Sequence, residues 1–132
     1  MPNQAKSYYF GPRGDLFLRP VGVRVRVAIG AAGAPTKSGT RRQSDPECAV
    51  ALGTAGQYLF TNLPIGADYH INSCELVTPA GTQLVAVANV TAFDASAGTM
   101  TVQARQTSDG AAANPANGAA LHLNFDVEAG AY

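Results

Sequence analysis

The side chains best suited to metal chemistry are two histidines, His70 and His122, on segments that alternate apolar and polar residues. His122 shares a polar face with Asn124, Asp126 and Glu128, because successive side chains of a strand point to opposite faces. This row forms a metal site only if His70 or another ligand lies opposite, since metals need several converging ligands. Polar alternation on a solvated strand face is the more ordinary interpretation, and we expect no metal.

No catalytic signature stands out in the sequence. Asp45, Glu47, Asp68 and Glu75 are possible acid–base pairs, but they lie in or beside expected loops with no spacing that enforces proximity. No serine lies in a nucleophile elbow, and no glycine-rich loop precedes a helix. We therefore predict that the protein is not an enzyme and that it has no cofactor and no small-molecule substrate.

Charge and hydropathy restrict the partners. The 132-residue chain is 46% hydrophobic and only 14% charged, and its nine basic residues balance nine acidic ones. Binding to a phosphate backbone needs a basic surplus, so nucleic acid is disfavoured. No stretch approaches the roughly 20 apolar residues of a membrane span, and the start has no apolar run of signal-peptide length. We expect no membrane partner.

Two further residue types could have chemical roles. Cys48 and Cys74 have no metal-binding spacing, and we expect both to be reduced, structural thiols. Carbohydrate binding would need exposed aromatic platforms. The chain has no tryptophan, and outside the arm Tyr58, Tyr69 and Tyr132 remain, with Phe60 expected in the core.

The elements that position these residues are strands. Residues 21–29 place five branched apolar side chains on one face and Arg24 and Arg26 on the other, which we interpret as protection of a sheet edge. Other strands are predicted over 48–52, 57–62, 69–77, 84–93, 99–106 and 121–128, with bulges after Ile71 and near Asn89. Seven or eight short strands predict an all-β fold, an antiparallel sandwich or jelly roll.

Loops and a terminal arm complete the predicted organisation. Residues 30–47 and 108–120 are expected to be long loops, the second too small and polar to belong to the core, and 94–98 the turn of a β-hairpin. Residues 1–20 form an extended N-terminal arm, broken by Gly and Pro, and 21–132 form one β-sandwich domain. The large apolar residues of the arm that we expect to make contacts are Tyr8, Tyr9, Phe10, Leu16 and Phe17. Large rings are rarely left in water, so the arm either folds back over its own sheet or packs on a neighbouring subunit.

The C-terminal part of the chain, over roughly residues 48 to 128, resembles a type of small virion protein encoded in the structural gene clusters of tailed bacteriophages. The order of a strand, a short turn, a strand, a small-residue loop and a closing strand is shared. The matching segments are Gly56-Gln-Tyr58, Val90-Thr-Ala-Phe-Asp94, Gly98-Thr-Met-Thr-Val-Gln-Ala-Arg105, Asn114-Pro-Ala-Asn-Gly118 and Leu121-His-Leu-Asn-Phe125.

The resemblance implies a structural component of the phage particle, and we expect a head decoration (cement) protein. Such proteins are small, all-β and often homotrimeric, and they bind the major capsid protein and sister subunits on the outer surface of the head. Assembly in the bacterial host cytoplasm agrees with the unpaired cysteines. The expected contacts are the apolar residues of the arm together with Arg41 and Arg42 of the loop 30–47. The alternative is a tail or fibre β-module that binds host glycan or another tail protein.

Overall fold

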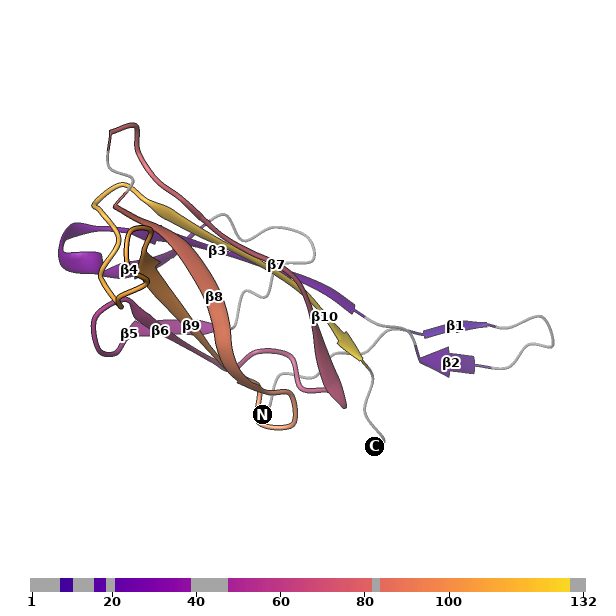
Figure 1. Cartoon of the computed structure of the whole chain (residues 1–132). Coiled ribbons are helices and arrows are strands. Elements are labelled where there is room, and N and C mark those ends of the chain that lie inside the picture. Colours follow the sequence, from indigo (N-terminus) through magenta and orange to yellow (C-terminus); the bar gives the residue numbers. More distant parts are fainter. Residues whose placement is uncertain (1–7, 11–15, 19–20, 39–47, 82–83, 129–132) are drawn as a thin grey trace.

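The computed structural model describes residues 8–10, 16–18, 21–38, 48–81 and 84–128. Eight of its strands form two four-stranded antiparallel sheets that pack face to face, so the predicted all-β sandwich is confirmed (Figure 1). The first sheet has the order β4-β3-β10-β7, with β3 at Val21–Ile29, β4 at Pro35–Ser38, β7 at Asp68–Val77 and β10 at Ala120–Glu128. The second has the order β5-β6-β9-β8, with β5 at Ala49–Leu52, β6 at Gln57–Thr61, β8 at Val85–Asp94 and β9 at Thr99–Gln106.

The topology contains a Greek key. β3 and β4, β5 and β6, and β8 and β9 are consecutive pairs, and the chain crosses between the sheets four times, from β4 to β5, β6 to β7, β7 to β8 and β9 to β10. The last crossing returns β10 to the middle of the first sheet, between β3 and β7. Such a long return to an earlier strand is the defining step of a Greek key.

The core lies between the sheets and follows from the alternation in the sequence. β3 and β10 each place every second side chain inward, and the inward residues of β10 are Leu121, Leu123, Phe125 and Val127. From the second sheet, Phe60, Met100 and Val102 meet them, each at most 2% exposed. Tyr58 is also fully buried, and its hydroxyl donates to the Gly33 carbonyl over 2.9 Å. This hydrogen bond connects β6 to the helical turn Ala31–Gly33.

Three sequence expectations were wrong. Residues 35–38 are strand β4, paired with β3, although the whole of 30–47 was expected to be loop. β3 consequently lies between β4 and β10, and β4 pairs with Arg26, so Arg26 does not protect a sheet edge. The loop 108–120 was expected to lie outside the core, yet Pro115 is buried and Ala119 is 2% exposed.

The predicted strand irregularities are largely confirmed. Ser73 pairs with Asn124 and Ile71 pairs with Phe125, so Asn72 is the extra residue of a bulge after Ile71. On β8 the register with β9 shifts twice, at Ala86 and at Thr91, on either side of the single bulge expected near Asn89.

The N-terminal arm contains a small hairpin. β1, at Tyr8–Phe10, pairs antiparallel with β2, at Leu16–Leu18, in a separate two-stranded sheet. Figure 1 shows this hairpin beyond the ends of β3 and β10, outside both sheets of the sandwich. The expectation of extended rather than helical structure is confirmed for these six residues.

Candidate functional site

The outward face of the first sheet is polar and organised in rows. Cross-strand pairing places His122 between Arg26 and Glu75, and Asn124 between Arg24 and Ser73. The side chains of such a row share one face of the sheet. The polar face predicted for residues 122–128 therefore exists, and it extends over three strands.

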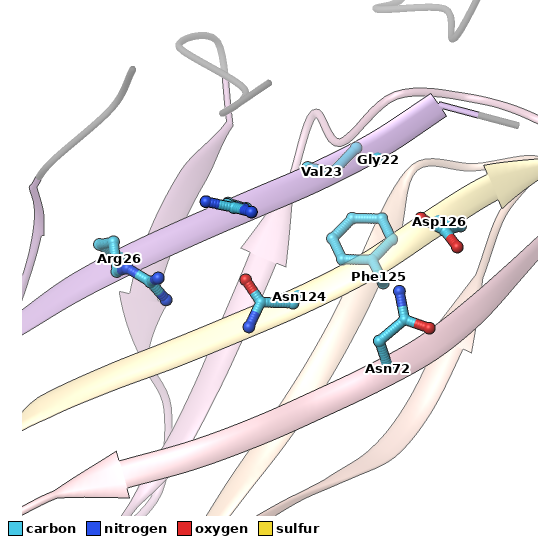
Figure 2. A pocket seen from close by; sticks show the side chains of 8 residues that line it. Gly22, Val23, Arg26, Asn72, Asn124, Phe125 and Asp126 are labelled. Carbon is cyan, nitrogen blue, oxygen red and sulfur yellow. The ribbon is translucent and has the colours of Figure 1, made fainter. Parts of the chain in front are cut away.

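A pocket of about 430 Å³ opens on this face (Figure 2). Gly22 lies opposite Asp126 in the register. Because Gly22 has no side chain, the space beside the Asp126 carboxylate is part of the pocket. The bulge places Asn72 at the opposite rim, and in Figure 2 its amide points toward Asp126. The polar residues that line the pocket are Arg24, Arg26, Asn72, Asn124 and Asp126.

Two atoms at this pocket have no hydrogen-bond partner although they are buried, Arg26 Nη1 and Asn124 Oδ1. The Asn124 amide nitrogen donates to Ser73 Oγ over 2.7 Å, which fixes the orientation of the amide. Burial, and next the Arg26 charge, lowers the pKa of His122, whereas Glu75 opposes the shift. The pocket thus offers one unused donor and one unused acceptor beside a neutral imidazole, an arrangement that suits a polar ligand with both kinds of group.

The two histidines do not converge. His70 lies opposite Asp126, and His122 lies opposite Glu75, in separate rows of the face. Within the described residues, no group of three His, Cys, Asp or Glu side chains is placed to hold a metal ion.

A second surface is the groove between β7 and β8, which we call the β7–β8 seam. Both strands are sheet edges, and they belong to opposite sheets. Phe93 pairs with buried Met100, and Val90 with buried Val102, so both face the core, yet Phe93 is 47% exposed and Val90 is only half-buried. The core-facing side of β8 is therefore partly open to solvent. The core-facing residues of the two strands that line this groove include Ile71, Cys74, Leu76, Ala88, Val90 and Phe93.

The exposed apolar surface gathers at this seam. The structure describes five exposed large hydrophobic residues, and Leu59, at 37%, is the one on β6. The other four lie on β8, at the end of β7 or in the connection between them, and are Val77, Leu84, Val87 and Phe93. Exposed apolar side chains that gather on neighbouring strands often mark an interaction surface.

The β8 edge also lacks the usual protection against pairing with another strand. Natural edges are protected by lysine, proline or charge, but Val85–Phe93 contains no charged residue and no proline. The opposite side of the sandwich differs, because β4 contains Pro35 and Lys37, and the Lys37 ammonium donates to the Cys48 carbonyl over 2.6 Å. The β8 edge is therefore unprotected, whereas the β4 edge is protected.

Both cysteines are free thiols, as expected, and Cys48 is buried. Cys74 lies in the seam, where burial and the neighbouring Glu75 raise the pKa of its thiol to about 11. The thiolate is the nucleophilic form of cysteine. Cys74 is therefore a weak nucleophile at neutral pH.

The predicted contact residues cannot be placed in either surface. Tyr8, Tyr9, Phe10, Leu16 and Phe17 lie on β1 and β2, for which the backbone alone is described, and Arg41 and Arg42 lie outside the described residues. Tyr58 and Tyr69 are buried, so neither is a sugar-binding platform, and Tyr132 is outside the described residues. The seam itself was missed, although the uncharged β8 sequence was a signal for it.

Comparisons with protein-family models, curated proteins and solved structures found no match. Among the described residues, no helix is long and apolar enough to cross a membrane.

Proposed function

We propose that this protein is a structural protein of a phage particle, a decoration protein that binds the head and stabilises it by protein–protein contacts. The proposal rests on the resemblance of residues 48–128 to small virion proteins and on the physical character of the sandwich. Its partners are the major capsid protein and sister subunits in a homotrimer, on the outer surface of the head. In this role the protein binds other proteins and catalyses no reaction.

The observation that carries the proposal is the β7–β8 seam. The isolated chain leaves Phe93 47% and Val87 47% exposed along an edge strand with no charge to keep other strands away. Fully burying such a side chain contributes roughly 1.5–3 kcal/mol, and covering the exposed half of each contributes about half as much, so covering them by protein favours assembly. A subunit with an uncovered apolar edge suits a role within a larger assembly.

The test is co-sedimentation of the purified protein with empty capsid shells. The proposal predicts saturable binding at a fixed ratio to the major capsid protein and shells that withstand higher temperature. A protein that stays in the supernatant at micromolar concentrations contradicts it.

The polar pocket favours a second candidate, a tail or fibre module that binds host glycan. Sugar hydroxyls both donate and accept, which matches Arg26 Nη1 and Asn124 Oδ1, the two unpartnered atoms there. Titration with cell-envelope glycans distinguishes the two functions, with Asn124→Ala as the pocket variant and Leu59→Ala as the control. Glycan binding that Asn124→Ala weakens at least tenfold, with no binding to shells, favours the second candidate.

A further inference from the structure

We infer that the β7–β8 seam is the receptor for the N-terminal arm, residues 1–20, of a second copy of this chain. The inference rests on the proposed function, which requires sister-subunit contacts, and it names the two surfaces that meet. The arm supplies an extended segment that completes the second sheet beside β8 and covers the core residues that the seam leaves open.

The receptor side is built for an extended segment. β7 and β8 are each ten residues long, or about 33 Å, and the groove follows both of them, from Phe93 at one end to Val77 at the other. The described strands leave the outer backbone groups of β8 without a sheet neighbour. An added strand supplies main-chain hydrogen bonds to such an edge and inserts alternate side chains into the groove.

The arm side needs a surface on which to dock. β1 and β2 pair three residues each, and an isolated two-stranded hairpin is at best marginally stable in water. Leu16 and Leu18 alternate on β2, so they share one face of the strand. Docking on the second sheet would stabilise a hairpin of this size, and the hairpin would cover the exposed edge of β8.

Charge supports this pairing. The arm has three basic residues, Lys6, Arg13 and Arg19, and one acidic residue, Asp15. The residues that line the seam include Glu75 and no lysine or arginine, and Asp94 follows Phe93 at the other end. A segment with a surplus of basic residues is therefore favoured beside Glu75 over a segment with a surplus of acidic residues.

A second copy is the donor because of where the hairpin lies. The described hairpin stands outside both sheets, beyond the end of β3 (Figure 1), and its strands pair only with each other. Fully extended, 20 residues span about 65 Å, which exceeds the dimensions of a domain with a radius of gyration of about 13 Å. Each copy then both gives and receives an arm, and such a head-to-tail contact forms a closed ring when the rotation between copies closes.

The experiment measures the mass of the full-length chain in solution by light scattering, without capsid shells. Leu18→Asp disrupts the donor, Val87→Lys disrupts the receptor at a half-exposed position, and Leu59→Lys is the matched control on the outward face of β6. The inference predicts a multiple of 13.6 kDa for the unmodified chain and for Leu59→Lys, and single chains for the other two variants. Hydrogen exchange of the β8 amides rises at least tenfold in both disrupted variants.

Each other result overturns the inference. An oligomer that survives Leu18→Asp assembles through another surface. A monomer whose β8 amides exchange faster after Leu18→Asp has its own arm in the seam, and a monomer with unprotected β8 amides has an empty seam. Because no shells are present, these results are separate from the proposed function, which stands or fails by co-sedimentation.

Discussion

The rings of Tyr69 and Phe93 lie 6.0 Å apart between centroids, inclined by 36°, and join the two sheets across the β7–β8 seam. Tyr69 belongs to β7 and is buried, whereas Phe93 belongs to β8 and is half-exposed. Tyr69 also stacks on Phe125 at 4.9 Å, and its hydroxyl donates to the Pro64 carbonyl over 2.6 Å. This aromatic cluster closes one end of an otherwise open groove.

Replacing Tyr69 by alanine should destabilise the protein more than replacing Phe93 by alanine. Phe93→Ala should lower the free energy of unfolding by about 1–2 kcal/mol, because it removes one ring contact and little buried area. Tyr69→Ala should cost about 3–5 kcal/mol, because it empties a core site. Urea unfolding measures both, with Leu59→Ala as the control for an exposed apolar residue. Equal losses at 69 and 93 would mean that the cluster is not organised around Tyr69.

Tyr58→Phe should destabilise the protein by about 1–3 kcal/mol, because the Gly33 carbonyl then stays buried without its donor. The same variant should also change how the free energy of unfolding depends on pH. Burial raises the pKa of Tyr58 to about 12 from an ordinary 10.0, so the folded state holds this proton more tightly than the unfolded state. Its contribution is complete below pH 10 and is lost as the pH rises to about 12. Unfolding curves across this window should fall more steeply for the unmodified chain than for Tyr58→Phe.

Two glycines with positive φ should respond differently to alanine. Gly56 has φ +69°, its N–H donates to Asn114 Oδ1 over 2.7 Å, and a Cβ there would collide with the Ala113 carbonyl oxygen. Gly110 has φ +73° and nothing within 4 Å of such a Cβ. We expect Gly110→Ala to cost about 1 kcal/mol and Gly56→Ala at least twice that, from thermal unfolding. A Gly56→Ala protein as stable as Gly110→Ala would contradict the tight approach of loop 107–119 to this turn.

Labelling of Cys74 with a thiol reagent reports on the seam. With a thiol pKa of about 11, the rate should rise steadily with pH from 7 to 10. Glu75→Gln removes a negative charge that raises this pKa, so labelling at pH 8 should be faster, whereas Asp109→Gln is a distant control. Cys48 is buried and should label only on unfolding. A rate that does not depend on pH would show that access rather than ionisation limits the reaction.

Removing the Arg26 charge should cost little stability. Arg26→Met keeps the aliphatic length and eliminates a buried Nη1 that has no hydrogen-bond partner, so the free energy of unfolding should change by less than about 1 kcal/mol. The pKa of His122 should rise, because Arg26 lowers it. Unfolding in urea and proton NMR titration of His122 measure the two effects. A large loss of stability would indicate that Arg26 has a structural partner.

The strands and bulges could be predicted because their signals are local. Alternation in residues 121–128 and the change of phase after Ile71 are visible within a few positions. β4 was missed because it is four residues long and contains Pro35, and a proline lowers any strand prediction. The mistaken edge role of Arg26 has another cause, since the neighbours of β3 come from residues 35–38 and 120–128. No local pattern predicts such distant pairing.

Each candidate surface also combines a feature that the local sequence predicts with a feature that depends on distant strand pairing. The polar face around His122 follows from alternation, but the pocket depends on Gly22 meeting Asp126 across two strands. The seam depends on which strands end each sheet, and that is a property of the topology. The uncharged run of β8 is compatible with a central strand as well as with an edge, so exposure could be decided only in three dimensions.

The central position of β10 has a consequence during synthesis. β3 and β7 have no pairing with each other and meet only through residues 120–128. Until that segment leaves the ribosome, the first sheet has a gap at its centre, and the apolar faces of β3 and β7 remain uncovered. The nascent chain therefore cannot complete its fold stepwise from the N-terminus, and chaperones that bind exposed apolar strands have their longest opportunity on this chain just before residue 128 emerges.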